Sequence, residues 1–258
     1  MNSVKSTHFP YNNSNNNRDN VDILWNSSHL YLFNDPSDQD QTELTSFALA
    51  MLFTGRLDFH ACQSKKPGKD GEYGFRKQET ITDITSLISK HLEGSETIGF
   101  YPLDTQDQCY YCAIDLDDHD GKIPQSDNAK KLSRFLLDNN LPVLVEKITS
   151  HDSYHIWIPI IPTKTHTVYK FVRQLLHDAG VKGDAYPKQK SIINCHKSCG
   201  DFLTLPLGIN SEKIGTSVFV EPRTLEPVGL VFVEKVIRLR DVAGPRAMMD
   251  KPPPEDAV

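Results

Sequence analysis

Several features are absent from the sequence, and each absence excludes a class of protein. Its 258 residues carry 28 basic against 34 acidic side chains, so the formal net charge is −6. A histone-like protein, which binds nucleic acid through bulk positive charge, is therefore excluded. No apolar run approaches the roughly 18 residues that a membrane span requires. The first residues contain no apolar segment of the kind found in secretory signals, so we expect no export and no membrane partner.

Cysteine is also scarce. Five cysteines in a chain of this length do not form a disulfide framework, so we expect a reducing, cytoplasmic location. Cys109-x-x-Cys112 and Cys195-His196-x-x-Cys199 have spacings that occur in zinc sites. However, Cys109 and Cys112 lie three residues apart on a predicted strand and should point to opposite faces, so structural zinc is not expected.

Two polar segments flank a predicted folded body. The first twenty residues hold seven asparagines, and such a tract buries too little apolar surface to offset the entropy of ordering it. Residues 1–26 are therefore predicted to be a disordered tail. Residues 241–258 contain three consecutive prolines and are predicted to be a linker or tail. Between them we expect an N-terminal αβ unit at 27–105 and a sheet-based unit at 106–240.

The second unit has the order of a split β-α-β sheet. Its apolar periodicity predicts strands at 108–117, 143–148, 154–161, 202–205 and 217–221, and helices at 126–139 and about 168–176. This order is β-α-β-β-α-β with one extra strand, as in ferredoxin-like folds, and it predicts an α+β protein. In such a sheet the first and third strands are the two central neighbours. Many activities use this sheet, so the order alone indicates no function.

The strongest local signal is a pair of carboxylates at the end of the strand Ala113-Ile114-Asp115-Leu116-Asp117. Residues two apart in a strand project to one face, so Asp115 and Asp117 should lie side by side. Two close carboxylates repel one another unless a cation lies between them, and oxygen ligands suit Mg²⁺ or Mn²⁺. The competing interpretation is a polar strand end that enters a turn. The apolar strand before the pair favours a site at the end of a sheet.

A second candidate group is Ser153-Tyr154-His155, which opens the predicted strand at 154–161. A single histidine on a strand is more often structural than functional. In the split β-α-β order, however, this strand adjoins the one that carries Asp115 and Asp117. We therefore expect His155 to lie near the carboxylate pair, where it could contact phosphates beside a metal.

A two-metal site needs a third acid. Glu221 closes the predicted strand at 217–221 and is the first candidate, although a glutamate at the end of a strand before Pro222 can also be an ordinary surface residue. Glu226 and Glu234 are the weaker alternatives. The three acids would together be able to hold two divalent cations.

Positive charge is concentrated in two segments despite the negative total. Residues 163–200 have a local balance of +5 and residues 64–77 a balance of +3, so the remainder carries −14. Ligands rich in phosphate would select such segregation. Solvated helix and loop faces are the competing explanation. Within the second segment, Lys65, Lys66 and Lys69 are the candidate DNA-binding residues.

Three short motifs, taken in chain order, resemble the three motifs of the archaeo-eukaryotic primase superfamily. They are DxD at Asp115 and Asp117, SxH at Ser153 and His155, and a hydrophobic residue with an acid at Val220-Glu221. Further stretches resemble the primase-polymerases of bacterial conflict systems and CRISPR loci, and together they span about 50–222. These stretches are LFTGR (52–56), IGFYPL (98–103), YPKQ (186–189) and GDFLTLPLG (200–208).

The resemblance implies a catalytic core in which the αβ unit packs on an RRM-like sheet. It also implies DNA-dependent primase-polymerase activity, with primer synthesis and extension by a two-metal mechanism. By motif, Asp115, Asp117 and Glu221 would hold two ions of Mg²⁺ or Mn²⁺. Ser153 and His155 would contact the incoming triphosphate, helped by Lys188 or Lys190, and Tyr101 would pack on its sugar.

The resemblance further implies the partners. They would be a single-stranded or primed DNA template and a dNTP or NTP, in a setting such as DNA replication or defence, with a fused or associated helicase, nuclease or CRISPR protein. Two alternatives stay open. The first is a polymerase that extends and fills gaps but cannot prime. The second is a catalytically silent nucleic-acid-binding module that uses the same sheet.

Overall fold

The structure is a computed structural model. It describes residues 38–53, 55–56, 58–64, 74–79, 81, 83–117, 124–149, 152–193, 200–209 and 217–229. All of these residues belong to one unit, Leu32–Val258. The predicted tails, the three lysines at 65, 66 and 69, Cys195, Cys199 and Glu234 lie outside the described residues. Within the described part of the chain, no helix combines the length and apolarity that a bilayer crossing demands.

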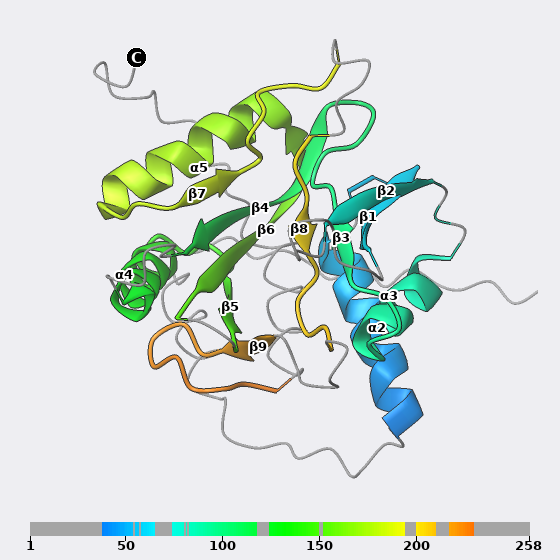
Figure 1. The fold of residues 1–258 in the computed structure, drawn as a ribbon. Helices are drawn as coiled ribbons and strands as arrows, with labels where there is room; N and C mark the ends of the chain where they lie inside the picture. The colour runs from blue at the N-terminus through cyan, green and yellow to red at the C-terminus, as the bar shows by residue number, and fades with distance from the viewer. Residues whose placement is uncertain are drawn as a thin grey trace, which may run out of the picture. The chain divides into compact units, whose positions relative to one another are not determined.

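The N-terminal part forms an antiparallel sheet, here called the first sheet. Its strands are β1 (Phe59–Gln63), β2 (Phe75–Glu79), β3 (Ile98–Phe100) and β8 (Leu203–Thr204), in the order β2-β1-β3-β8. Helices α2 (Asp38–Phe53) and α3 (Ile84–Leu92) pack against each other beside it (Figure 1). Helix α3 begins at Asp83, whose carboxylate accepts hydrogen bonds from the backbone N–H groups of Thr85 and Ser86. These bonds satisfy donors that the first turn leaves free.

The second sheet has five antiparallel strands. They are β4 (Gln108–Leu116), β5 (Leu144–Ile148), β6 (Tyr154–Lys164), β7 (Asp184–Tyr186) and β9 (Ser217–Val220), in the order β7-β4-β6-β5-β9. Helix α4 (Gln125–Asp138) follows β4, and α5 (Thr165–Ala179) follows β6. The chain order from β4 to β7 is that of a split β-α-β sheet, with β4 and β6 as the central neighbours. The α+β fold class and this central pairing are confirmed.

The fourth strand of this motif differs from the prediction. We expected residues 202–205 in that place, but the structure uses Asp184–Tyr186, and Leu203–Thr204 pairs with β3 in the first sheet. Beyond β8, the N–H of Leu205 donates to the carbonyl of Ile98 at 2.9 Å. A strand of three residues is too short to show an alternation of apolar and polar residues, so the sequence pattern does not reveal β7.

The two faces of the second sheet are buried by different elements. Side chains alternate along each strand, so Ile114 and Ile156 lie on one face, and Tyr111 and Trp157 on the other. Phe53, at the end of α2, meets the rings of Tyr111 and Trp157 at centroid distances of 5.6 and 4.7 Å. Helices α4 and α5 also contact β4 and β6, and they therefore cover the Ile114 face (Figure 1). The hydroxyl of Tyr111 donates to the carbonyl of Phe100 at 2.8 Å and links the two sheets.

The loop before β6 is fastened to the start of α4. Pro124 occupies the N-cap position of α4 and supplies no side-chain hydrogen bond. Instead, Oδ2 of Asp152 accepts from the backbone N–H groups of Gln125 and Ser126, at 2.8 and 3.4 Å. This remote cap fixes the position of the residue that directly follows it, Ser153.

Replacement of Asp152 by alanine should destabilise the protein. The first turn of α4 loses its hydrogen-bond acceptor, and the loss of an N-cap costs about 1 kcal/mol. Asp138→Ala removes the same charge from the last turn of α4, where no such cap is lost, and is the matched control. Urea unfolding of both variants measures the difference. Equal free energies of unfolding for Asp152→Ala and the wild type would contradict the capping role.

Candidate active site

A row of side chains crosses the second sheet on the face that also carries Trp157. Backbone pairing places Asp184 of β7 opposite Asp115 of β4, and Asp115 opposite His155 of β6. His155 is in turn opposite Glu146 of β5, and Glu146 is opposite Phe219 of β9. Directly paired residues in antiparallel strands share a face, so four ionisable side chains stand next to one another across four strands.

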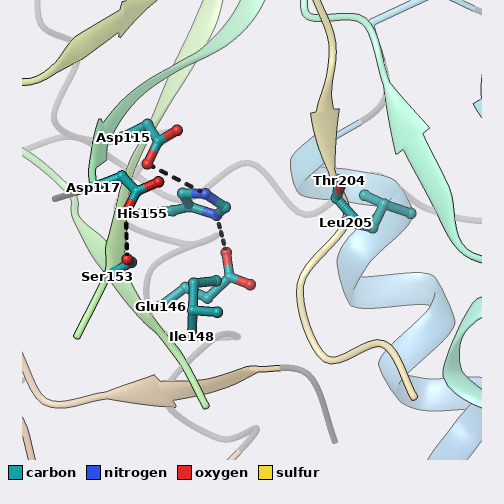
Figure 2. Close-up of a pocket in the computed structure, with 8 residues that line it drawn as sticks. All are labelled: Asp115, Asp117, Glu146, Ile148, Ser153, His155, Thr204 and Leu205. Atoms are coloured by element: carbon teal, nitrogen blue, oxygen red, sulfur yellow. Dashed lines mark hydrogen bonds and ion pairs between the residues drawn. The ribbon is translucent and has the colours of Figure 1, made fainter. Parts of the chain in front are cut away.

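Three members of this row, Asp115, His155 and Glu146, line one wall of a pocket of about 290 Å³ between the two sheets (Figure 2). The strands of the second sheet and the residues at their ends contribute Asp115, Asp117, Glu146, Ile148, Ser153 and His155, and β8 with the residue after it contributes Thr204 and Leu205. Four residues that the sequence motifs single out are therefore brought together: both aspartates of DxD, and the serine and histidine of SxH. Glu146 was not predicted to be there.

The imidazole of His155 lies between two carboxylates. Its Nδ1 is 2.8 Å from Oε2 of Glu146, and its Nε2 is 3.7 Å from Oδ1 of Asp115 (Figure 2). A carboxylate can only accept, so Nδ1–H is the donor in the shorter contact. The indole N–H of Trp157 donates to the same Oε2 at 2.8 Å. The side chain of Glu146 is only 3% exposed, so these two bonds hold a buried carboxylate.

Both central groups have shifted pKa values. Burial lowers the pKa of His155, but the charge and the hydrogen bond of Glu146 raise it more, and Asp115 and Asp117 add to the rise. The net result is a raised pKa, so the imidazole is more readily cationic than a free one. Burial also raises the pKa of Asp115, against the opposing charge of His155, and the Asp117 and Asp184 carboxylates raise it further.

Ser153 contacts the second carboxylate of the pair. Its hydroxyl is buried and donates to Oδ1 of Asp117 at 2.8 Å (Figure 2). The contact of Ser153 with a triphosphate, which the family resemblance implies, stays a prediction. In the structure, Ser153 fixes the orientation of the exposed carboxylate of the pair.

Glu221 is not brought to the carboxylate pair. It follows β9, which lies three strands from β4, and three strand spacings amount to about 14 Å. Its Oε2 accepts from the backbone N–H groups of Arg223 and Thr224, at 2.9 and 2.6 Å, and so closes a turn. The N–H of Glu221 bonds to the carbonyl of Glu226, which belongs to the same turn. Neither glutamate lines the pocket.

The other predicted nucleotide-binding residues also lie outside the pocket lining. Tyr101 is 6% exposed, and its ring packs on Phe202 at a centroid distance of 5.6 Å. Lys190 places its ammonium group 5.5 Å from the ring centre of Tyr169. Lys188 is nearer to the site, because its ammonium group pairs at 2.7 Å with Asp184, the neighbour of Asp115 in the row.

The carboxylate pair fits a divalent cation. Asp115 and Asp117 project from one face at the end of β4 and supply hard oxygen ligands. Mg²⁺ commonly binds one or two carboxylates and completes its shell with water and substrate phosphates. Among the residues that the structure describes, no group of three or more His, Cys, Asp or Glu side chains is arranged to hold a metal.

Of the four cysteines whose spacing occurs in zinc sites, only Cys109 and Cys112 lie within the described residues. Cys109 and Cys112 are both buried, and their sulfurs contact the carbonyls of Tyr111 and Ile158 at 2.9 and 3.7 Å. Burial raises the pKa of both thiols, which disfavours the thiolate that binds metal.

Glu146 is the site residue that the sequence analysis did not identify. It is a charged residue within the otherwise apolar start of β5, Leu144-Val145-Glu146. Such a glutamate in a buried strand is a signal in itself, since a buried carboxylate requires partners. The partners become apparent only when β5 is aligned with β6.

Comparison with known protein families gives a match over most of the chain. The model of the family described as "TOTE conflict system, Archaeo-Eukaryotic Primase domain" matches residues 47–236. This span is well over half of the chain and includes every residue that lines the pocket. A search of curated proteins gives no significant match.

Solved structures show remote similarity. The catalytic domain of primase RepB′ in complex with initiator DNA is 10% identical, with a TM-score of 0.39, and the alignment covers 83% of this chain and 100% of that chain. The polymerase domain of Mycobacterium tuberculosis ligase D in complex with DNA is 11% identical, with a TM-score of 0.41, and the alignment covers 83% and 91% of the two chains.

Asp115→Asn should stabilise the metal-free protein at neutral pH. The folded state raises the pKa of Asp115 above its ordinary value of 3.8, so ionisation of this carboxyl disfavours folding. The advantage of the asparagine variant should therefore be present at about pH 7.5 and shrink as the pH falls towards about 4.5. Urea unfolding in the presence of a chelator measures it. A stability difference that does not change with pH would contradict this account.

Proposed function

Because the chain belongs to the archaeo-eukaryotic primase domain family of TOTE conflict systems, we propose that it is a DNA-dependent primase-polymerase that adds nucleotides to a growing strand by a two-metal mechanism. Family membership itself supports nucleotidyl transfer on DNA. The observation that carries the finer proposal is the shared pocket: the DxD carboxylates and the SxH histidine line one wall of it, in register on adjacent strands.

Asp115 and Asp117 would be ligands of two divalent cations, Mg²⁺ or Mn²⁺. The chemistry that such a pair of cations would supply is activation of the primer 3′-hydroxyl by one ion and stabilisation of the leaving pyrophosphate by the other. Ser153 keeps the Asp117 carboxylate in one orientation through its hydrogen bond. Glu221 is left out of this proposal because three strand spacings separate β9 from β4.

His155 would contact the incoming triphosphate. Three carboxylates line the pocket, so a polyphosphate can enter only if positive charge compensates them. The imidazole supplies part of that charge when it is protonated, which its raised pKa favours, and its Nε2 lies on the side of Asp115. Lys188 adds a second positive charge nearby, because it forms an ion pair with Asp184, the residue opposite Asp115 on β7.

Asp115→Asn and Asp117→Asn should each reduce nucleotide incorporation by more than about a hundredfold. Loss of residues that only orient a metal ligand costs about ten- to a hundredfold, and loss of the ligand itself should exceed this. Extension of a primed template with Mn²⁺ is the measurement. Glu221→Gln is the matched control and should remain close to wild type. Near-normal extension by either aspartate variant would contradict the assignment.

The same assay distinguishes the activities that the family permits. Short products on a bare template would support priming, whereas products that require a primer would support a polymerase that only extends. DNA binding without incorporation, with either dNTPs or NTPs, would support a silent binding module.

Reversal of charge at Lys65, Lys66 and Lys69 should weaken DNA binding and flatten its dependence on salt. Each lost phosphate contact lowers the slope of log affinity against log salt by about 0.7–0.9. The control is Lys130→Glu with Arg134→Glu on α4, which covers the face of the sheet opposite to the pocket. Titrations at several salt concentrations provide both slopes. An unchanged slope for the triple variant would show that these three lysines do not contact DNA.

A further inference from the structure

Glu146 is a charged group that the proposed chemistry does not itself require. Its side chain is 3% exposed, and its strand, β5, lies between β6 and β9 in the second sheet. Burial of a carboxylate is unfavourable unless hydrogen bonds replace the lost water. Two donors fill that role at one oxygen: Nδ1 of His155 and Nε1 of Trp157, both at 2.8 Å from Oε2.

These contacts fix the imidazole ring of His155 from two sides. Nδ1 is held by Glu146, so the opposite ring nitrogen, Nε2, faces Asp115 at 3.7 Å (Figure 2). The indole ring of Trp157 meets the imidazole edge to face, with centroids 5.6 Å apart and an angle of 85° between the planes. Without Glu146, the Nδ1 edge would have no acceptor of this kind, and the ring could turn about its side-chain torsions.

We propose that Glu146 is a positioning residue, which holds His155 so that Nε2 faces the pocket where the incoming triphosphate binds. The proposal rests on the proposed function for the identity of the ligand. It assigns Glu146 no contact with the triphosphate itself, and its effect on nucleotide binding passes entirely through His155.

A different role for Glu146, as the third metal ligand, fits the geometry less well. Its Oε2 already accepts two N–H groups, and the imidazole of His155 stands between it and Asp115. A cation held by Asp115 and Asp117 would have to displace that ring to reach Oε2. The two roles predict different results for a glutamine at this position, since glutamine accepts hydrogen bonds but is a poor ligand for Mg²⁺.

The test compares Glu146→Ala and Glu146→Gln with Val145→Ala. Val145 is the fully buried neighbour on the same strand and points to the opposite face, so its variant reports a loss of stability alone. Binding of dATP in the presence of Mn²⁺ is measured by calorimetry, and the melting temperature on the same preparations. Glu146→Ala should weaken dATP binding about tenfold, Glu146→Gln about two- to threefold, and Val145→Ala should melt lower with unchanged binding.

Two further measurements separate positioning from other roles. In a His155→Ala background, Glu146→Gln should weaken dATP binding no further, because its effect passes through the imidazole. In the NMR spectrum of the imidazole nitrogens, the protected Nδ1–H signal of His155 should be present in the wild type and absent in Glu146→Ala, whether or not nucleotide is incorporated.

The outcomes that overturn the proposal are distinct from failure of the proposed function. Additive losses in the double variant, an Nδ1–H signal that survives Glu146→Ala, or unchanged dATP binding by Glu146→Ala would each overturn the positioning role. A Glu146→Gln variant as inactive as Asp115→Asn would indicate a metal ligand instead. Failure of the wild-type protein to bind dATP would refute the proposed function, while the NMR signal would still report the Glu146–His155 contact.

Discussion

The pairing of β4 with β6 is the interaction on which the rest of the structure depends. It places Asp115 opposite His155, and a shift of β6 by one residue would turn His155 to the face covered by α4 and α5, away from Asp115. The register is held on that covered face by Ile114 and Ile156, which are fully buried. On the other face, Trp157 packs against Phe53. The same alternation that fills the core therefore directs the polar groups into the pocket.

Concentration of negative charge is the physical consequence of this arrangement. Three carboxylates line one pocket, and each is balanced differently: Glu146 by buried N–H donors, Asp117 by the hydroxyl of Ser153, and Asp115 by an imidazole that is not within hydrogen-bonding distance. Burial raises the pKa of Asp115, and the neighbouring Asp117 and Asp184 carboxylates raise it further. A divalent cation would relieve the repulsion between Asp115 and Asp117, so binding of a cation would stabilise this arrangement.

The sequence predicted what depends on local pattern and missed what depends on strand neighbours. Alternation along one strand was enough to place Asp115 and Asp117 on one face, and the split β-α-β order placed His155 beside them. Glu221 carries a comparable local motif, but its distance from the pair follows from β9 pairing with β5, which no local pattern encodes. Glu146 was missed for the same reason, because its role appears only in the register of β5 against β6.

The most direct measurement asks whether a template base dictates which nucleotide is added. The wild-type protein is given a primed DNA template, Mn²⁺ and one dNTP at a time, and the single template base next to the primer end is varied. The account predicts that the nucleotide incorporated changes with that base according to Watson–Crick pairing. Addition that ignores the template base, or no addition with any dNTP or NTP while the protein is folded and binds DNA, would contradict it.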